Sequence, residues 1–289
     1  MIAPKKTVLV VGASSGIGAA VAAYFHQKNW RVLATSRHPS GFKSTSDFTW
    51  LPLDVTDSSS VKNLVTYLLD QNIVPDVLVN VAGVGYHGPL EIFSDTDLAS
   101  QFEVNLFGIF RIIRSILPLM RSRHTGRIIN ISSVMAVAPA PFLGIYSASK
   151  SALESLSTTL RYELSLQGIP VSYIEPGFVN TPFGSHVITP QNWHHYQSIK
   201  ENFETNYHLQ RSRLSSPLLK SLTSPERVAV VVYKAAVVRS PHLRYVVGCE
   251  NRLYLFLRSL LPVNLQSFIF SLVYPGLRSL KSSGSEKEK

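Results

Sequence analysis

A turn rich in glycine and serine, placed between two apolar stretches, constrains this chain more than any other feature. It follows a continuous apolar run at 7–11, precedes a helical pattern at 17–28, and consists of Gly12, Ala13, Ser14, Ser15, Gly16, Ile17 and Gly18. Glycine permits a tight turn and lets a ligand approach the backbone closely. A helix that begins there presents free N–H groups and the positive end of its dipole. The turn therefore predicts a strand–turn–helix unit suited to a nucleotide pyrophosphate.

Apolar runs and helical patterns alternate along the first part of the chain. We expect strands at 7–11, 31–35, 50–53, 76–80, 127–131 and 171–174. We expect helices at 17–28, 58–71, 95–121 and 146–167, followed later by a helix at 226–239 and a strand at 245–247. Strands that are apolar along their whole length indicate a parallel sheet buried on both faces. The fold class is therefore α/β: a Rossmann-type, doubly wound parallel sheet with helices on both faces.

No proline- or glycine-rich linker divides the 289 residues, so we expect a single domain over 1–281. Residues 182–222 are polar and helical in pattern, and are interpreted as a substrate lid over the carboxyl end of the sheet. Residues 252–278 form an apolar segment that also carries basic residues, and 282–289 are expected to be a disordered polar tail.

Composition bounds the cellular setting of the chain. The hydrophobic fraction of 45% and the charged fraction of 16% are typical of a folded protein. There is neither a secretory signal nor an uninterrupted apolar run of about 18 residues, so no spanning helix is expected. The single cysteine, Cys249, excludes an internal disulfide and is expected to be buried. A cytoplasmic protein is predicted, and a peripheral membrane contact is left open.

The net charge of +10 is concentrated in one part of the chain. Between Thr205 and Lys281 there are eleven lysines and arginines, but only Glu226 and Glu250 as acids. Three interpretations remain open: a solvated basic face, contact with an anionic membrane surface, or an acidic substrate. No known nucleic-acid-binding motif accompanies the charge, so no nucleic acid partner is expected.

A tyrosine and a lysine four residues apart are the candidate catalytic pair. Tyr146 and Lys150 lie on one face of an expected helix, where an ammonium beside a phenol would lower the phenol pKa. Such a tyrosine can donate or accept a proton near neutral pH. Ser133 follows the fifth expected strand, and its hydroxyl could hold a substrate oxygen; Ser132 beside it would point the other way.

Together these residues resemble the short-chain dehydrogenase/reductase family from about residue 7 to 181. The matching positions are Gly12, Gly16, Gly18, Asp54, Asn80-Val81-Ala82-Gly83, Asn105, Ser133, Tyr146, Lys150, Pro176-Gly177 and Thr181. Two positions depart from the family pattern. Val11 stands where a threonine is usual, and Val81 where a second asparagine is usual. The second change removes one hydrogen bond on the cofactor side and leaves the strand intact.

The resemblance implies a role for each position. Tyr146 would be the general acid/base, Lys150 would lower its pKa and bind the nicotinamide ribose, Ser133 would orient the substrate carbonyl, and Asn105 would anchor a water in a proton relay. Asp54 would bind adenine, and Thr181 with the backbone near Val179 would fix the carboxamide. The implied cofactor-binding set is Gly12, Ser14, Ser15, Gly16, Ile17, Gly18, Arg37, Asp54, Asn80, Ala82, Gly83, Tyr146, Lys150, Val179 and Thr181.

The end of the second expected strand favours NADP(H) as the cofactor. NAD-preferring sites usually place an acid there, on the ribose hydroxyls. This chain has Thr35-Ser36-Arg37 instead. A guanidinium attracts a 2′-phosphate, which a carboxylate would repel. The alternative is that Arg37 is a solvated loop residue.

Several apolar residues predict a lipophilic substrate. Pro139, Pro141, Phe142 and Phe183 would line its pocket. The pattern at 224–229 and 244–248 resembles the branch with hydroxysteroid and retinol dehydrogenases and lipid ketone reductases. Residues 252–278 either complete the pocket wall or dock on a bilayer as an interfacial element. His87, His194 and His195 lack partners at metal-ligand spacing, so they are interpreted as loop or lid residues and no metal is expected.

The leading prediction is an NADP(H)-dependent oxidoreductase. It would transfer a hydride between the nicotinamide and a lipophilic ketone or alcohol that is steroid-, retinoid- or lipid-like, in a direction left open. The alternative is a non-catalytic NADP(H)-binding sensor or a membrane-associated scaffold. The resemblance also implies homo-oligomers, commonly through the helices near 95–121 and 146–167, without deciding between monomer, dimer and tetramer.

Overall fold

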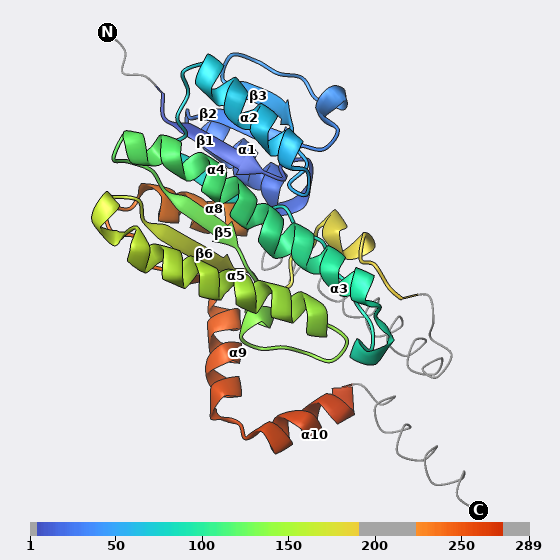
Figure 1. The fold of residues 1–289 in the computed structure, drawn as a ribbon. Helices are drawn as coiled ribbons and strands as arrows, with labels where there is room; N and C mark the ends of the chain where they lie inside the picture. Colours follow the sequence, from blue (N-terminus) through green and yellow to red (C-terminus); the bar gives the residue numbers. More distant parts are fainter. Residues whose placement is uncertain (1–4, 191–223, 274–289) are drawn as a thin grey trace, which may run out of the picture.

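A seven-stranded parallel sheet forms the centre of the computed structural model, which describes residues 5–190 and 224–273 (Figure 1). The strands are β1 (Thr7–Val11), β2 (Arg31–Ser36), β3 (Phe48–Pro52), β4 (Val77–Asn80), β5 (Ile128–Ile131), β6 (Val171–Glu175) and β7 (Arg244–Val246). Their order across the sheet is β3-β2-β1-β4-β5-β6-β7, and each neighbouring pair is parallel. The predicted single-domain, doubly wound α/β fold is confirmed.

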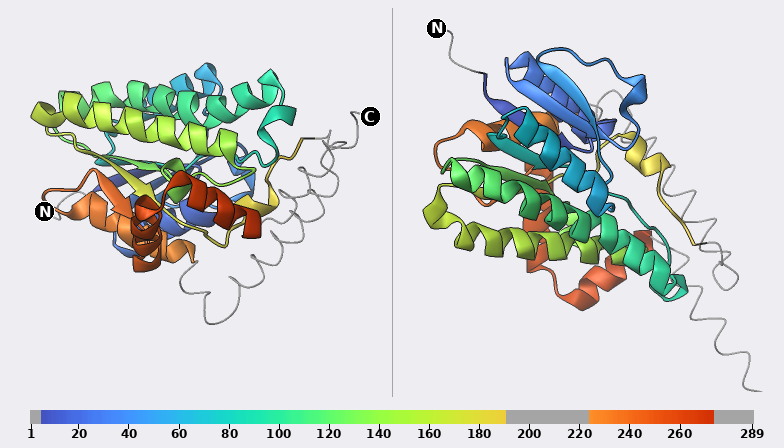
Figure 2. Two further views of the ribbon diagram at one scale, coloured as in Figure 1. Left: turned by 90° about the horizontal axis from the view of Figure 1, so that it is seen from below. Right: turned by 45° about the horizontal axis from the view of Figure 1, so that its top comes forward.

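Helices cover both faces of the sheet because each strand is apolar on both sides. In β1, Leu9 and Val11 pack in one core cluster and Val8 and Val10 in the other, as the alternation of a strand requires. The first cluster lies under α2 (Ser58–Asp70), α4 (Ile109–Ser122) and α5 (Gly144–Glu163), and the second under α1 (Gly16–Gln27) and α8 (Pro225–Val237). Figure 2 shows the sheet between these two layers.

The helix expected at 95–121 contains a wider turn in its middle. It starts as α3 (Asp95–Phe102), where the side chains of Ser94 and Asp97 form a reciprocal capping box. A π-helical stretch, η3 (Glu103–Gly108), then leads directly into α4. A π-bulge adds a residue to one turn and so re-aims the side chains around it, which is common at functional sites. Here the stretch carries Asn105.

Strand β1 is the point at which the strand order reverses. The chain continues from β1 to β2 and β3 on one side, whereas β4 to β7 lie on the other. The loops after β1 and β4 meet there, since the N–H groups of Val81 and Ala82 both donate to the Val11 carbonyl at 2.9 Å. In open α/β sheets the ligand crevice lies at such a reversal, outside the carboxyl ends of the strands.

Two helices follow β7 and lead away from the sheet. These are α9 (Cys249–Leu260) and α10 (Val263–Val273). Cys249 is exposed at the start of α9, so the expectation that it is buried is wrong. It fails because the first turn of α9 lies at the surface, where none of the α9 residues is buried.

Parts of the predicted extension lie outside the described residues. They include most of the lid at 182–222, with His194 and His195, and the tail at 282–289. Within the lid, Pro182–Ser185 form a short 3-10 turn, η6. No helix in the described ranges is long and apolar enough to cross a membrane.

Candidate active site

The glycine turn after β1 packs so closely against its neighbours that side chains at Gly12 and Gly18 would not fit. Gly12 and Gly16 have φ of +87° and +54°, a region that side chains rarely adopt. A Cβ on Gly12 would lie 2.7 Å from the Ala82 nitrogen, and one on Gly18 would collide with the Gly12 carbonyl. Ser15 caps α1 without a side-chain hydrogen bond, so its hydroxyl leaves the first-turn N–H groups unsatisfied. This geometry fits a pyrophosphate.

Thr181 lies against the same turn from the opposite side. A Cβ on Gly16 would be 3.0 Å from the Thr181 Cβ, although the two residues are far apart in the sequence. The segment after β6, which includes Val179 and Thr181, therefore borders the start of α1. The exposed side chains of Ser14 and Ser15, and the half-buried Ile17, complete the turn.

Tyr146 lies in the first turn of α5, beside the segment that follows β5. The Ser133 hydroxyl, which is buried directly after that strand, acts on the phenol of Tyr146 and lowers its pKa. Ser132 faces away, and its hydroxyl donates to the Glu154 carboxylate at 2.5 Å. Ser133 is therefore the one of the two serines that can share a substrate oxygen with Tyr146.

The pKa of Tyr146 does not move in the expected direction. Burial of the phenol raises the pKa above its usual value, and the hydrogen bond with Ser133 only partly opposes this. The Lys150 Nζ lies 5.9 Å from the centroid of the Tyr146 ring and donates to the Ile131 carbonyl at 2.8 Å. For these side chains by themselves the predicted lowering is wrong, because the burial of the phenol outweighs the groups that lower its pKa.

Lys150 and Glu154 form a buried, coupled pair one turn apart on α5. Burial lowers the pKa of Lys150 to about 8, against the opposing charge of Glu154. Burial raises the pKa of Glu154 to about 7, helped by Glu175 and opposed by the hydrogen bond from Ser132. Both groups therefore change charge close to neutral pH. Sequence reasoning missed Glu154, although it lies at i+4 from Lys150 on the same helix face.

Asn105 is fully buried and fixes the loop after β4 to α5. Its Nδ2 donates to the Val84 carbonyl at 3.0 Å and to the Ser149 Oγ at 3.2 Å, while its Oδ1 accepts from the Val84 N–H at 2.8 Å. Gln101, one turn earlier, donates to the Val84 carbonyl at 2.9 Å and accepts from the Tyr86 N–H at 3.0 Å. Gln101 and Ser149 were missed; the i, i+4 spacing of Gln101 and Asn105 is the signal that could have found the first.

The side chains of Asn105 and Lys150 both approach Gly83 at the edge of the sheet. A Cβ there would lie 3.2 Å from the Asn105 Oδ1 and 3.6 Å from the Lys150 Nζ. Asn105 and Lys150, from different helices, thus face one point beside the loop after β4. The water relay through Asn105 stays a prediction.

On the far side of the turn, Arg37 and Asp54 follow neighbouring strands. Arg37 is exposed after β2. Burial acts to raise the pKa of Asp54, but hydrogen bonds from Thr56 and the charge of Arg37 outweigh it and lower the pKa. Thr35 accepts a hydrogen bond from the Gly12 N–H at 3.2 Å, which ties the end of β2 to the glycine turn.

Asn80 lies deeper, at the end of β4. Its Nδ2 donates to the Asn130 Oδ1 at 2.8 Å, in a buried pair across β4 and β5. The Asn80 Oδ1 is buried and has no hydrogen-bond partner among the described residues. Asn80 therefore keeps an unused acceptor next to Ala82 and Gly83.

Three loops with aromatic residues border Tyr146. The ring of Phe183 lies 6.0 Å from the Tyr146 ring. Phe142 is buried with a φ of +67°, and its carbonyl accepts from the Gly88 N–H at 2.8 Å. His87 is in the same loop as Gly88, and burial lowers its pKa to about 4, so its imidazole is neutral at pH 7. Pro139, on the same loop as Phe142, is exposed.

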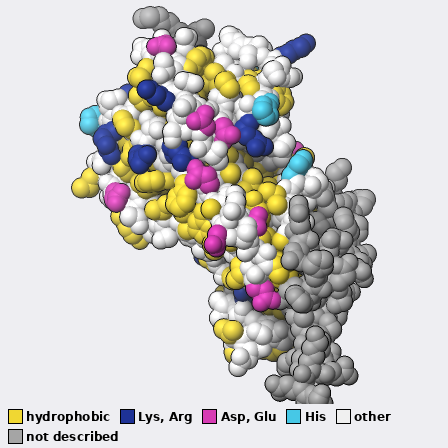
Figure 3. All heavy atoms as spheres, turned by 45° about the vertical axis from the view of Figure 1, so that its right-hand side comes forward, with side chains coloured by type: hydrophobic (Ala, Val, Ile, Leu, Met, Phe, Trp, Pro, Cys, Tyr) yellow, Lys and Arg dark blue, Asp and Glu magenta, His cyan; other side chains and the backbone are white. Residues whose placement is uncertain are grey.

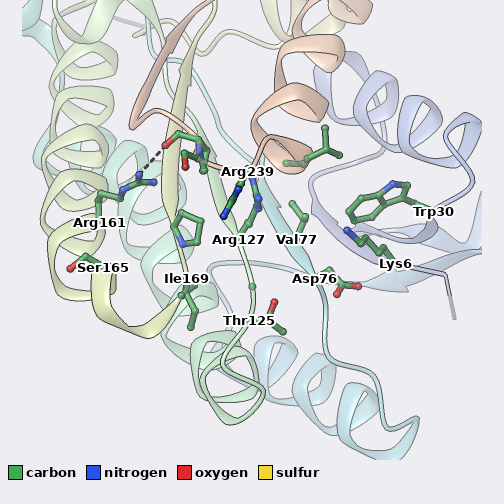
Figure 4. Close-up of a pocket in the computed structure, with 17 residues that line it drawn as sticks. Lys6, Trp30, Asp76, Val77, Thr125, Arg127, Arg161, Ser165, Ile169 and Arg239 are labelled. Carbon is green, nitrogen blue, oxygen red and sulfur yellow. Dashed lines mark hydrogen bonds between the residues drawn. The ribbon is translucent and has the colours of Figure 1, made fainter. Parts of the chain in front are cut away.

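A separate pocket of about 480 Å³ opens at the amino end of the sheet (Figure 4). Arg127 and Arg161 line it, and their guanidinium groups donate to the carbonyls of Ala235, Val171 and Pro241. These arginines hold backbone together at the end of the sheet away from Tyr146, so this pocket is not the candidate active site. No cluster of three or more metal-ligating side chains occurs in residues 5–190 and 224–273.

Comparison with known proteins identifies the family. Residues 6–192 match the short chain dehydrogenase family model. The chain belongs to this family. The short-chain dehydrogenase is 31% identical to a 3-ketodihydrosphingosine reductase of Bacteroides thetaiotaomicron, over 92% of this chain and 97% of the relative. It is 38% identical to human retinol dehydrogenase 8, over 63% of this chain and 62% of the relative.

Solved structures support the fold of this short-chain dehydrogenase. A short-chain dehydrogenase from Streptomyces avermitilis is 28% identical with a TM-score of 0.77, over 98% of this chain and all of that one. ElxO with NADP bound is 25% identical with a TM-score of 0.69, over 84% and 97% of the two chains. A Burkholderia phymatum enzyme in complex with NAD has a TM-score of 0.75 at 23% identity, over 91% and 95%. Both nicotinamide cofactors therefore occur among its structural neighbours.

Proposed function

We propose that this short-chain dehydrogenase uses NADP(H) to interconvert a lipophilic ketone and its alcohol, with Tyr146 as the general acid/base. The observation that carries the proposal is the meeting of Tyr146, Ser133, Lys150 and Asn105 beside the Gly12 turn, at the switch point of the sheet. A nicotinamide bound along this crevice would supply or accept the hydride.

The protonation state of Tyr146 suits the donation of a proton to a carbonyl oxygen. Because burial raises the pKa of Tyr146, its phenol is protonated at neutral pH and can donate to a carbonyl oxygen. Ser133 shares a hydrogen bond with that phenol, so it can hold the same carbonyl oxygen in place. Lys150 contributes a buried charge close to the ring, and Asn105 fixes the loop that carries Gly83.

The preference for NADP(H) rests on Arg37. This arginine is exposed, and its charge acts on Asp54, so both residues flank the part of the crevice next to β2. Ser36 precedes it, so no acid ends β2 to repel a 2′-phosphate. Asp54, Asn80, Ala82, Val179 and Thr181 are proposed to bind other parts of the cofactor.

A lipophilic substrate is supported by the apolar border of the site and by the relatives. Phe142 and Phe183 lie on the substrate side of Tyr146. One relative is named for reducing a sphingoid ketone, and another as a retinol dehydrogenase. Homo-oligomers and a peripheral membrane contact are part of the same proposal.

The test is NADPH and NADH oxidation by the purified protein with a panel of ketones. The panel contains steroids, retinal, long-chain 3-keto lipids and acyl dihydroxyacetone phosphate. We expect turnover with NADPH, reduced about 10²- to 10⁴-fold in Tyr146→Phe, because this variant keeps the ring but loses the transferable proton. Unchanged turnover in the variant would exclude Tyr146 as the acid. Tight NADPH binding without turnover on any ketone would instead support the sensor or scaffold.

A further inference from the structure

The helices α9 and α10 extend from the body of the molecule as an arm (Figure 1). Neither contributes a residue to the two hydrophobic clusters of the core, and none of the α9 residues is buried. The part that projects below the body in Figure 3 shows hydrophobic side chains and few charged ones. The arm is therefore a place where apolar side chains face outward instead of into a core.

Each helix of the arm carries one apolar stripe at helical spacing. In α9 the stripe is Leu253, Phe256, Leu257 and Leu260, with exposed fractions of 50–63%. In α10 the same i, i+3, i+4, i+7 pattern recurs as Leu265, Phe268, Ile269 and Leu272, with 40–55% exposed. Contiguous exposed patches of this kind mark an interaction surface. A helix with such a stripe is suited to lie along an apolar boundary.

The acid of the arm is paired, so the charge left unpaired on it is basic. Glu250 is its only acid, and both oxygens of this carboxylate are engaged by Arg227, at 2.7 and 3.1 Å. Arg252 is exposed and has no partner among the described residues, and α10 contains no charged residue. A second copy of the arm would bring like charges together with no free acid to pair them. An anionic lipid surface supplies the complementary charge.

The arm contacts two loops at the carboxyl edge of the sheet, the edge at which the candidate site lies. The Arg258 guanidinium donates to the Pro139 carbonyl at 2.9 Å, on the segment that leads to Phe142 and Tyr146. At the start of α9, Asn251 donates to the Val247 carbonyl at 2.7 Å and fills the space beside Gly177, just after β6. Both contacts are with loops at the carboxyl edge of the sheet, so whatever covers the arm lies next to the substrate entrance.

We propose that the arm docks on the surface of an anionic lipid bilayer, with the two stripes at the acyl boundary and Arg252 among the headgroups. Docking places the Pro139 segment against the bilayer, so a lipophilic substrate passes from the lipid to Tyr146 without crossing water. This second part rests on the proposed function, whereas docking itself does not.

Vesicle flotation of the full-length protein tests docking, with phosphatidylcholine vesicles that contain or lack phosphatidylserine. We expect binding that is stronger with phosphatidylserine and weakened by added salt. The double variant Phe256→Ser/Ile269→Ser should bind about tenfold or more weakly. The matched control is Leu166→Ser, which changes a leucine that is 98% exposed in the 3-10 turn after α5 and should bind as the unaltered protein does.

Equal binding by the double variant and the unaltered protein, or no binding by either, would overturn the proposal. So would a dimer in solution that dissociates in the double variant, since the stripe would then cover a second copy. Turnover of a small soluble ketone separates docking from catalysis. The double variant should keep this turnover and lose that of a long-chain ketone presented in vesicles. Absence of all turnover would contradict the proposed function and leave the flotation result valid.

Discussion

The carboxyl edge of the sheet and the α9–α10 arm reverse the usual places of polar and apolar side chains. At the sheet edge, Asn105 and Lys150 are 0% and 5% exposed. In the arm, Phe256 and Leu260 are 61% and 63% exposed. Buried polar groups are costly unless their hydrogen bonds are satisfied, and exposed apolar groups add nothing to the core. Both regions therefore depart from what stability alone would select.

The two departures are resolved differently. Asn105 meets its hydrogen-bonding requirements within the protein, through Val84 and Ser149. The arm does not satisfy its apolar stripes by packing in either core cluster. The hydrogen bonds of Asn105 are thus made within the protein, whereas neither core cluster of the described residues covers the stripes of the arm. This difference is expected if the sheet edge is a catalytic site and the arm is a surface that binds another surface.

The largest stability effect should distinguish core from arm. Ile112→Ala, in the core side of α4, should lower the free energy of unfolding by about 2–5 kcal/mol through lost burial and the cavity left behind. Leu253→Ala, on a stripe of α9, should change it by less than about 0.5 kcal/mol. Urea unfolding at constant m-value measures both. A large loss in Leu253→Ala would show that the stripe is packed in solution and would break the comparison.

The sequence predicted the sheet edge better than the arm. Apolar runs, the Gly12 turn and the Tyr146–Lys150 spacing are local patterns, so they indicated the fold and the candidate site before any coordinates. The π-helical turn at Glu103–Gly108 was not predicted, because one residue inserted into a helical turn leaves the apolar pattern on either side unchanged. The direction of the Tyr146 pKa shift was predicted wrongly, because it depends on burial and the i, i+4 spacing says nothing about burial.

The orientation of the apolar stripes of the arm could not be predicted for a different reason. An apolar pattern at 252–278 is equally compatible with packing on the body and with facing outward, so both interpretations stayed open. Cys249 was expected to be buried because free cysteines usually are, and it is exposed. Which face of a helix is covered depends on tertiary neighbours, and these become visible only when the elements are placed in space.

A smaller effect, on cofactor binding, is expected from replacing Arg37, which is exposed after β2. Arg37→Ala should raise the KM for NADPH about 10- to 100-fold, since it removes a charge-assisted contact with the 2′-phosphate. The KM for NADH should change little, because NADH lacks that phosphate. Steady-state kinetics with both cofactors measure the ratio. Equal changes for the two cofactors would mean that Arg37 is only a solvated loop residue.

The smallest effect concerns the buried pair on α5. The pKa of Glu154 is raised to about 7, chiefly by burial, so the stability of its neutral form is present at low pH and lost as pH rises from about 4.5 through 7. Glu154→Gln should flatten this fall in the melting temperature, whereas Glu163→Gln, exposed at the end of α5, should not. Glu154 also raises the pKa of Lys150, which lies at about 8, so the glutamine should move the alkaline limb of activity to lower pH. An unmoved limb in Glu154→Gln would show that the pair is buried for packing and does not tune the site.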